Sequence, residues 1–141
     1  MNPGFRHICF ADDDPDDHLV FSTAFEETFP GTALYSFYRC DELLVFLNDE
    51  NRPLPDMIFL DLNMPGNDQF ECLRMIKQTP RLQHIQVVIY TSSNYYKNAE
   101  EAIRNGAFRY IHKPSSFGEL KSILKELLSS YGSPGNNALY R

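Results

Sequence analysis

The sequence predicts a doubly wound α/β fold, a (βα)5 sandwich built on a five-stranded parallel sheet. Three short, continuous apolar runs, at 8–11, 57–60 and 87–90, are typical of strands that are buried on both faces. Between these runs the apolar residues recur at the spacing of helices. Alternating strands and helices imply a parallel sheet with right-handed crossovers and helices on both of its faces.

The first half of the chain contains two strands and two helices. Asp14 followed by Pro15 is a favourable helix start, because aspartate caps a helix and proline suits its first position. The run at 29–31, Phe-Pro-Gly, is a helix stop. A second strand is predicted at about 33–38, where Ser36 interrupts the apolar character as expected at a sheet edge. The helix after it is indicated by Leu43, Leu44 and Leu47.

The second half continues the alternation after the strands at 57–60 and 87–90. A helix from about 95 to 105 should bury only a thin stripe, and Gly106 should end it. The segment at 108–112 is predicted as the other edge strand, because Arg109 and His112 interrupt it. The apolar helix positions are Phe70, Leu73 and Ile76, then Ala99, Ala102 and Ile103, then Phe117, Leu120, Ile123, Leu124, Leu127 and Leu128.

Length and charge limit the classes of function. A chain of 141 residues is the size of one domain, predicted to span 1–130 with a flexible tail at 131–141. With 13 basic and 19 acidic residues, the net charge of -6 disfavours direct binding to nucleic acid. No apolar run approaches the roughly 18 residues of a membrane helix, so we expect a cytoplasmic protein without a membrane segment.

Cysteines and histidines give no catalytic or metal-binding pattern. Cys9, Cys40 and Cys72 show no metal-ligand spacing, and we predict three reduced, buried thiols in a reducing compartment. The histidines, which are scattered over different elements, are interpreted as surface or strand-edge residues: His7, His18, His84 and His112.

Polar chemistry follows the strands at one edge of the predicted sheet. In such sheets ligands bind outside the carboxyl ends of the strands. Three carboxylates there, Asp12, Asp13 and Asp61, would repel one another without a cation, and oxygen ligands favour a hard ion such as Mg²⁺. The Thr91 hydroxyl and the Lys113 ammonium would add a donor and a positive charge, which suit an anionic group such as phosphate.

Some of the acidic residues have simpler interpretations. Asp14, Asp16 and Asp17 are predicted to be solvated, with Asp14 as a helix cap. A calcium-binding loop that starts at Asp12 is disfavoured, because Asp17 stands at its glycine position and Thr23 at its closing glutamate position.

Four motifs in a fixed order resemble those of the receiver domains of bacterial two-component response regulators. They are A-D-D-D-P-D-D at 11–17, I-F-L-D-L-N-M-P-G at 58–66, Y-T-S-S at 90–93 and Y-I-H-K-P-S-S-F at 110–117. The resemblance covers nearly the whole chain and implies a flavodoxin-like fold with strand order 2-1-3-4-5. The run K-P-S-S-F is similar to that of stand-alone receivers, which include chemotaxis and phytochrome-associated regulators.

The resemblance implies a phosphoacceptor rather than an enzyme with a separate substrate. Asp61 would take a phosphoryl group from a histidine kinase or a phosphotransfer protein. Asp12, Asp13, Asp61 and the backbone carbonyl of Asn63 would hold Mg²⁺ or Mn²⁺. The receiver would assist its own phosphorylation and dephosphorylation, and would then act on a downstream protein target.

The same resemblance implies roles for the residues around the phosphoacceptor. Lys113 would pair with the phosphoryl group, and the bond between Lys113 and Pro114 would be cis. Thr91 and Tyr110 would form the switch that remodels the partner surface. Gln69 departs from the family pattern, which usually has glycine there and thus a different local loop.

Two other functions remain open from the sequence, and a homodimer is compatible with each. A degenerate receiver would act as a constitutive interaction module, but it would normally lack Asp61, Lys113 or the acidic pair. A phosphohydrolase of the haloacid dehalogenase type also forms an aspartyl phosphate. It needs an Asp-x-Asp on its first strand, whereas Asp61 follows the third.

Overall fold

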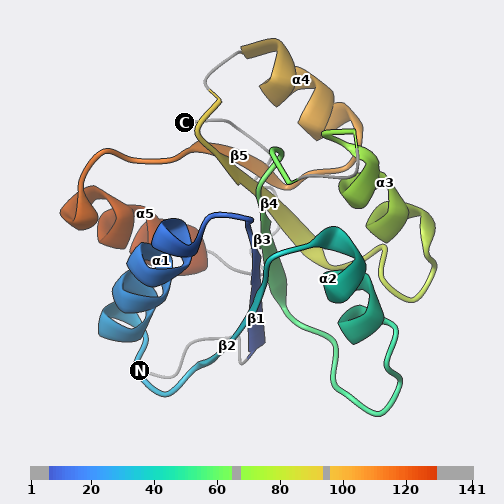
Figure 1. Ribbon diagram of the computed structural model, residues 1–141, viewed down its shortest axis with the longest axis horizontal. Coiled ribbons are helices and arrows are strands. Elements are labelled where there is room, and N and C mark those ends of the chain that lie inside the picture. Colours follow the sequence, from blue (N-terminus) through green and yellow to red (C-terminus); the bar gives the residue numbers. More distant parts are fainter. Residues whose placement is uncertain (1–6, 65–67, 94–95, 130–141) are drawn as a thin grey trace.

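Five parallel strands form one sheet in the order β2-β1-β3-β4-β5 in the computed structural model, which describes residues 7–64, 68–93 and 96–129 (Figure 1). The predicted fold class, strand order and alternation of elements are confirmed. The strands are β1 (His7–Ala11), β2 (Ala33–Phe37), β3 (Met57–Leu60), β4 (Gln86–Thr91) and β5 (Arg109–His112). The helices are α1 (Pro15–Thr28), α2 (Cys40–Leu47), α3 (Glu71–Gln78), α4 (Tyr96–Arg104) and α5 (Phe117–Ser129).

The central strands are buried on both faces because helices cover the sheet from both sides. Helices α1 and α5 lie on one face, and α2, α3 and α4 lie on the other (Figure 1). Side chains alternate between the two layers, so that Phe10 and Phe59 pack under α1 and α5 while Cys9 and Ile58 pack on the opposite face. The sheet is therefore covered by apolar packing on both of its faces.

Local sequence signals fix where the helices begin and end. The Asp14 carboxylate accepts a hydrogen bond of 2.9 Å from the Asp16 N–H, and Pro15 is the first residue of α1, as predicted. Gly31 and Gly106 have φ angles of 87° and 105°, in the left-handed region that glycine enters without strain. The thin stripe of α4 is also confirmed, because Ala99 and Ala102 are buried.

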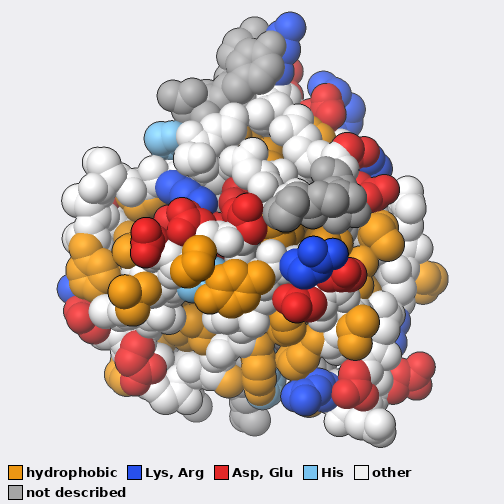
Figure 2. All heavy atoms as spheres, in the orientation of Figure 1, with side chains coloured by type: hydrophobic (Ala, Val, Ile, Leu, Met, Phe, Trp, Pro, Cys, Tyr) orange, Lys and Arg blue, Asp and Glu red, His pale blue; other side chains and the backbone are white. Residues whose placement is uncertain are grey.

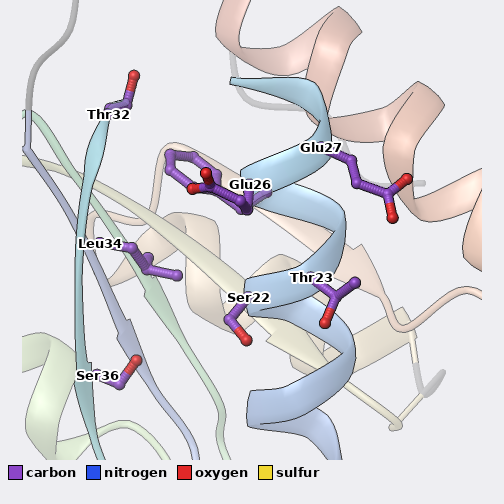
Figure 3. Close-up of a pocket in the computed structure, with 8 residues that line it drawn as sticks. Ser22, Thr23, Glu26, Glu27, Thr32, Leu34 and Ser36 are labelled. Atoms are coloured by element: carbon purple, nitrogen blue, oxygen red, sulfur yellow. The ribbon is translucent and has the colours of Figure 1, made fainter. Parts of the chain in front are cut away.

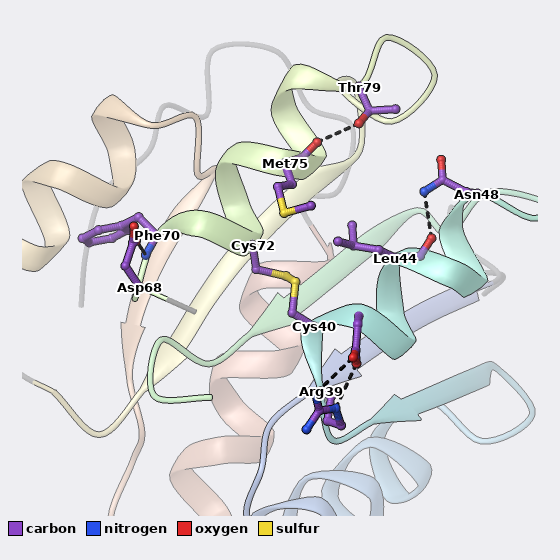
Figure 4. The surroundings of a disulfide bond; sticks show 10 residues. Arg39, Cys40, Leu44, Asn48, Asp68, Phe70, Cys72, Met75 and Thr79 are labelled. Atoms are coloured by element: carbon purple, nitrogen blue, oxygen red, sulfur yellow. Dashed lines mark hydrogen bonds and ion pairs between the residues drawn. A yellow bond between two sulfur atoms is a disulfide. The ribbon is translucent and has the colours of Figure 1, made fainter. Parts of the chain in front are cut away.

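The prediction of three reduced cysteines is wrong for two of them. Cys40, at the start of α2, and Cys72, in the first turn of α3, form a disulfide across 32 residues of sequence (Figure 4). The two helices pack on the same face of the sheet, which brings the sulfurs together although no local spacing indicates it. Cys9 is the free cysteine, and burial raises the pKa of its thiol to about 12.

Two further predictions, the domain limits and the lack of a membrane segment, can be compared with the structure only within the described residues. Among those residues, no helix combines the length and the apolar character needed to cross a membrane. The predicted tail at 131–141 lies outside the described residues.

Candidate phosphoacceptor site

Four strands deliver the predicted site residues to the carboxyl edge of the sheet. Asp12 follows β1 and Asp61 follows β3, and the pairing of Ala11 with Leu60 places these two aspartates beside each other. Thr91 is the last residue of β4, and Lys113 follows β5. The structure therefore brings together the side chains that the sequence predicts at this edge.

Asp12, Asp13 and Asp61 form an acidic cluster. One carboxylate oxygen from each residue lies within 4.8 Å of the others, which is a spacing that could hold a metal ion. The side chains of Asp12 and Asp61 are buried, whereas Asp13 is exposed. The donor set consists of carboxylate oxygens, which fits a hard divalent cation. Figure 2 shows acidic side chains gathered next to a basic one near the start of α1.

Burial changes the protonation of Asp12 within this cluster. It raises the pKa of Asp12 to about 6, and the neighbouring Asp61 charge adds to the rise, while hydrogen bonds from Lys113 and from the Asp14 N–H oppose it. Burying charged carboxylates side by side is unfavourable unless a cation lies near them. The cluster therefore favours a bound cation electrostatically.

The Lys113 side chain places a positive charge beside the acidic cluster. Its Nζ lies 2.8 Å from Asp12 Oδ2, 2.7 Å from Asp17 Oδ2 and 3.6 Å from Asp61 Oδ2. Burial lowers the pKa of this ammonium, but the hydrogen bonds to Asp12 and Asp17 outweigh burial and leave the pKa above its ordinary value. The side chain is therefore a fixed cation next to the acidic cluster.

Thr91 is connected to the acidic cluster through Asn63. The Asn63 side-chain amide donates a hydrogen bond of 3.2 Å to Thr91 Oγ1, and the Asn63 N–H donates one of 3.3 Å to Asp61 Oδ1. The Thr91 side chain is fully buried. The hydroxyl thus lies in a hydrogen-bonded chain that begins at Asp61.

Tyr110 is buried on β5 beside the end of β4. Its hydroxyl donates a hydrogen bond of 2.7 Å to the main-chain carbonyl of Ser93, two residues beyond Thr91. Burial raises the pKa of the phenol, so the hydroxyl stays protonated as a donor. A movement of the segment after Thr91 would therefore be felt at Tyr110.

A family model for the response regulator receiver domain matches residues 8–125, a span that contains every site residue described above. The chain belongs to this family.

Relatives and solved structures agree with this assignment. The receiver is 33% identical over 111 residues to the probable methanogenesis regulatory protein FilR2 of Methanothrix harundinacea, covering 79% of this chain and 68% of that protein. The phosphorylated cyanobacterial phytochrome response regulator RcpA is 25% identical, with a TM-score of 0.81 over 92% of this chain and 96% of that one. The Mn²⁺-bound form of response regulator Rcp1 has the same identity and TM-score, and 99% of it is covered.

The receiver differs from the sequence predictions at the peptide bond before Pro114. The described residues contain no cis peptide bond, so the bond between Lys113 and Pro114 is trans rather than cis. The Lys113 side chain is long enough to bring its ammonium to Asp12 and Asp17 from this backbone. The length of the Lys113 side chain therefore places its positive charge beside Asp12 and Asp17, without a cis peptide bond.

Two residues of α1 have roles that the sequence analysis missed. The sequence predicts a solvated Asp17, but its carboxylate binds Lys113. The sequence predicts His18 as a surface or strand-edge residue, but it is buried, donates a hydrogen bond of 2.7 Å to the Asp12 carbonyl and stacks on Tyr38. Asp17 and His18 lie about one helical turn after the cap at Asp14, and helical periodicity after Pro15 is the signal that could have placed them inward.

A separate groove of about 640 Å³ lies between α1 and the edge strand β2 (Figure 3). It does not include any residue of the acidic cluster. Its walls combine hydroxyl, apolar and acidic side chains, namely Ser22, Thr23, Phe25, Glu26, Glu27, Thr32, Leu34 and Ser36.

The pKa of Asp12 predicts a pH-dependent affinity for metal in this receiver. A protonated carboxyl is a poor ligand, so Mn²⁺ should bind roughly tenfold more weakly at pH 5 than at pH 7.5, on either side of the pKa of about 6. In the metal-free protein, a raised carboxyl pKa stabilises the fold at low pH, and this contribution is lost as the pH rises through about 6.

Calorimetric titration with Mn²⁺ across this pH range measures the effect. Asp16→Asn removes an exposed carboxylate from the first turn of α1 and should keep the pH profile. An affinity that is the same at both pH values would contradict the role given to Asp12.

Proposed function

We propose that this receiver accepts a phosphoryl group on Asp61 in a reaction that depends on a divalent metal. The observation that carries the proposal is the buried Asp61 carboxylate, which lies within the acidic cluster and 3.6 Å from the Lys113 ammonium. The Asp61 carboxylate, which is the nucleophile, has the Lys113 ammonium near it and lies among carboxylates that could hold a metal cation. These positive charges would stabilise an incoming anionic group.

The chemistry is a transfer from nitrogen to oxygen. A carboxylate oxygen of Asp61 attacks the phosphorus of a phosphohistidine, the bond from phosphorus to the imidazole nitrogen breaks, and that nitrogen keeps the electron pair. The products are an aspartyl phosphate and a free histidine side chain. Because the protein supplies mainly position and charge, the donor can be a histidine kinase or a phosphotransfer protein.

Asp12, Asp13, Asp61 and the backbone carbonyl of Asn63 are the groups that would hold the metal, Mg²⁺ or Mn²⁺. When bound, the ion offsets the negative charge of the transferring phosphoryl oxygens. The oxygen-only donor set and the raised pKa of Asp12 support this assignment, and the similar regulator Rcp1 is known in a Mn²⁺-bound form.

Lys113, Thr91 and Tyr110 would act after the transfer. Lys113 pairs with a phosphoryl oxygen through its ammonium, and Thr91 donates its hydroxyl to another. Because Asn63 now donates to Thr91, that contact must rearrange as the hydroxyl turns to the phosphoryl group. Tyr110 follows through its hydrogen bond to the Ser93 carbonyl, which changes the surface that a downstream protein binds.

The kinase would meet the receiver next to the acidic cluster. Leu19, Val20 and Tyr38 are exposed large side chains on α1 and on the loop after β2. Exposed apolar side chains that are bordered by polar residues are typical of a surface that binds another protein. Phe21, in contrast, belongs to the core.

The test is the intact mass of the receiver after incubation with acetyl phosphate. We expect the mass of one added phosphoryl group with Mg²⁺ present, and no gain when a chelator removes the metal. Mild hydroxylamine should reverse the gain, because it cleaves acyl phosphates. A receiver that gains no mass and also binds no Mg²⁺ would instead be a constitutive interaction module.

A further inference from the structure

Asp17 contacts the same ammonium that the proposed chemistry needs. Its Oδ2 lies 2.7 Å from Lys113 Nζ, across 96 residues of sequence. The same Nζ is 2.8 Å from Asp12 and 3.6 Å from Asp61. The ammonium is therefore bound by two carboxylates that are not the phosphoacceptor, and it is not within hydrogen-bond distance of the one that is.

The position of Asp17 is fixed by the start of α1. The cap at Asp14 and the proline at the first helical position anchor the first turn that carries Asp17. The Asp17 side chain is 32% exposed and that of Lys113 is 14% exposed, so water only partly screens the ion pair. Such a pair is worth more than one on the open surface and costs free energy to separate.

A phosphoryl group on Asp61 would compete with Asp17 for Lys113. Its oxygens would attract the ammonium toward Asp61, and the contact with Asp17 would lengthen or break. The negative charge of Asp17 remains at its place on α1 in both states. Each phosphorylation event therefore includes the loss of one charge-assisted hydrogen bond that the unphosphorylated receiver has.

We propose that Asp17 is a positioning residue that holds Lys113 away from Asp61 and so disfavours the phosphorylated state. This inference rests on the proposed function. It assigns to α1 a restraint on the phosphate-binding ammonium, and it predicts that the strength of the restraint sets how readily the receiver stays phosphorylated.

The experiment uses beryllofluoride, which binds to an aspartate carboxylate as a stable mimic of a phosphoryl group. Its affinity for the receiver is measured by ¹⁹F NMR at saturating Mg²⁺. Removing a partly screened ion pair changes an equilibrium by about threefold to tenfold, so Asp17→Asn should bind beryllofluoride more tightly by that factor. Asp17→Glu, which keeps the charge, should restore the wild-type affinity at least in part.

Asp16→Asn is the matched control, because it removes one exposed negative charge from the same turn without removing a contact to Lys113. It should bind beryllofluoride as the wild type does. An equal gain in affinity for Asp16→Asn and Asp17→Asn would show a general effect of charge and overturn the inference.

Lys113→Met separates a restraint on the ammonium from a structural effect on the loop. In this background Asp17→Asn should leave the weaker affinity unchanged, because no ammonium is left to release. A gain of the same factor in both backgrounds would overturn the inference. If the wild type binds no beryllofluoride and gains no phosphoryl group, the proposed function itself fails. If the wild type does both and Asp17→Asn matches it, only the role of Asp17 fails.

Discussion

Asp61→Asn is expected to abolish the metal-dependent gain of a phosphoryl group. The substitution keeps the size of the side chain, but an amide is a very poor nucleophile compared with a carboxylate. We expect labelling by acetyl phosphate to fall by more than about a hundredfold, to below detection by intact mass. The variant should also bind Mn²⁺ more weakly, because one of the three carboxylates of the acidic cluster is lost.

Folding of this variant must be established before the loss is interpreted. Replacing Asp61 removes a negative charge that raises the pKa of Asp12, so the metal-free variant should unfold at no lower temperature than the wild type. Asp16→Asn should label like the wild type. A phosphoryl group on Asp61→Asn, located at another aspartate by peptide mapping, would contradict the assignment of the phosphoacceptor.

Reduction of the Cys40–Cys72 disulfide is expected to lower the free energy of unfolding by about 3–4 kcal/mol. This figure follows from the chain entropy that a cross-link over 32 residues removes from the unfolded state. The disulfide joins α2 to α3 on one face of the sheet, so both helices lose a covalent tie. Urea unfolding with and without a thiol reductant measures the difference.

Thiol counting and one double variant make this test decisive. Under denaturing conditions without reductant the chain should show one reactive thiol, that of Cys9, and reduction should raise the count to three. The stability of Cys40→Ala/Cys72→Ala should not respond to reductant. Three reactive thiols before reduction would show that the cysteines are unpaired and would contradict the structure at this point.

The sequence was informative where local patterns determine the structure. Continuous apolar runs mark the central strands, and the rule that parallel strands end at one edge predicts that Asp12, Asp61, Thr91 and Lys113 meet there. The cap at Asp14 depends on neighbouring residues alone and was equally predictable.

What the sequence did not show depends on how distant elements pack. The contact between Asp17 and Lys113 depends on the rotation of α1 against the end of β5, and that rotation is set by packing of Phe21 and Phe25 in the core. The disulfide depends in the same way on how α2 and α3 lie on the sheet. No local sequence pattern indicates how close two such distant elements lie in the folded protein.

The assembly of the site from β1, β3, β4 and β5 has a consequence for protein synthesis. Asp12 and Asp61 leave the ribosome well before Lys113, whose contact with Asp17 closes a separation of 96 residues. Closing such a long loop costs entropy, so contacts of this kind form slowly even after both residues have been made. A nascent receiver thus presents its acidic residues without the Lys113 ammonium until β5 has been made. If the proposed function holds, chains that end before β5 would be unable to accept a phosphoryl group.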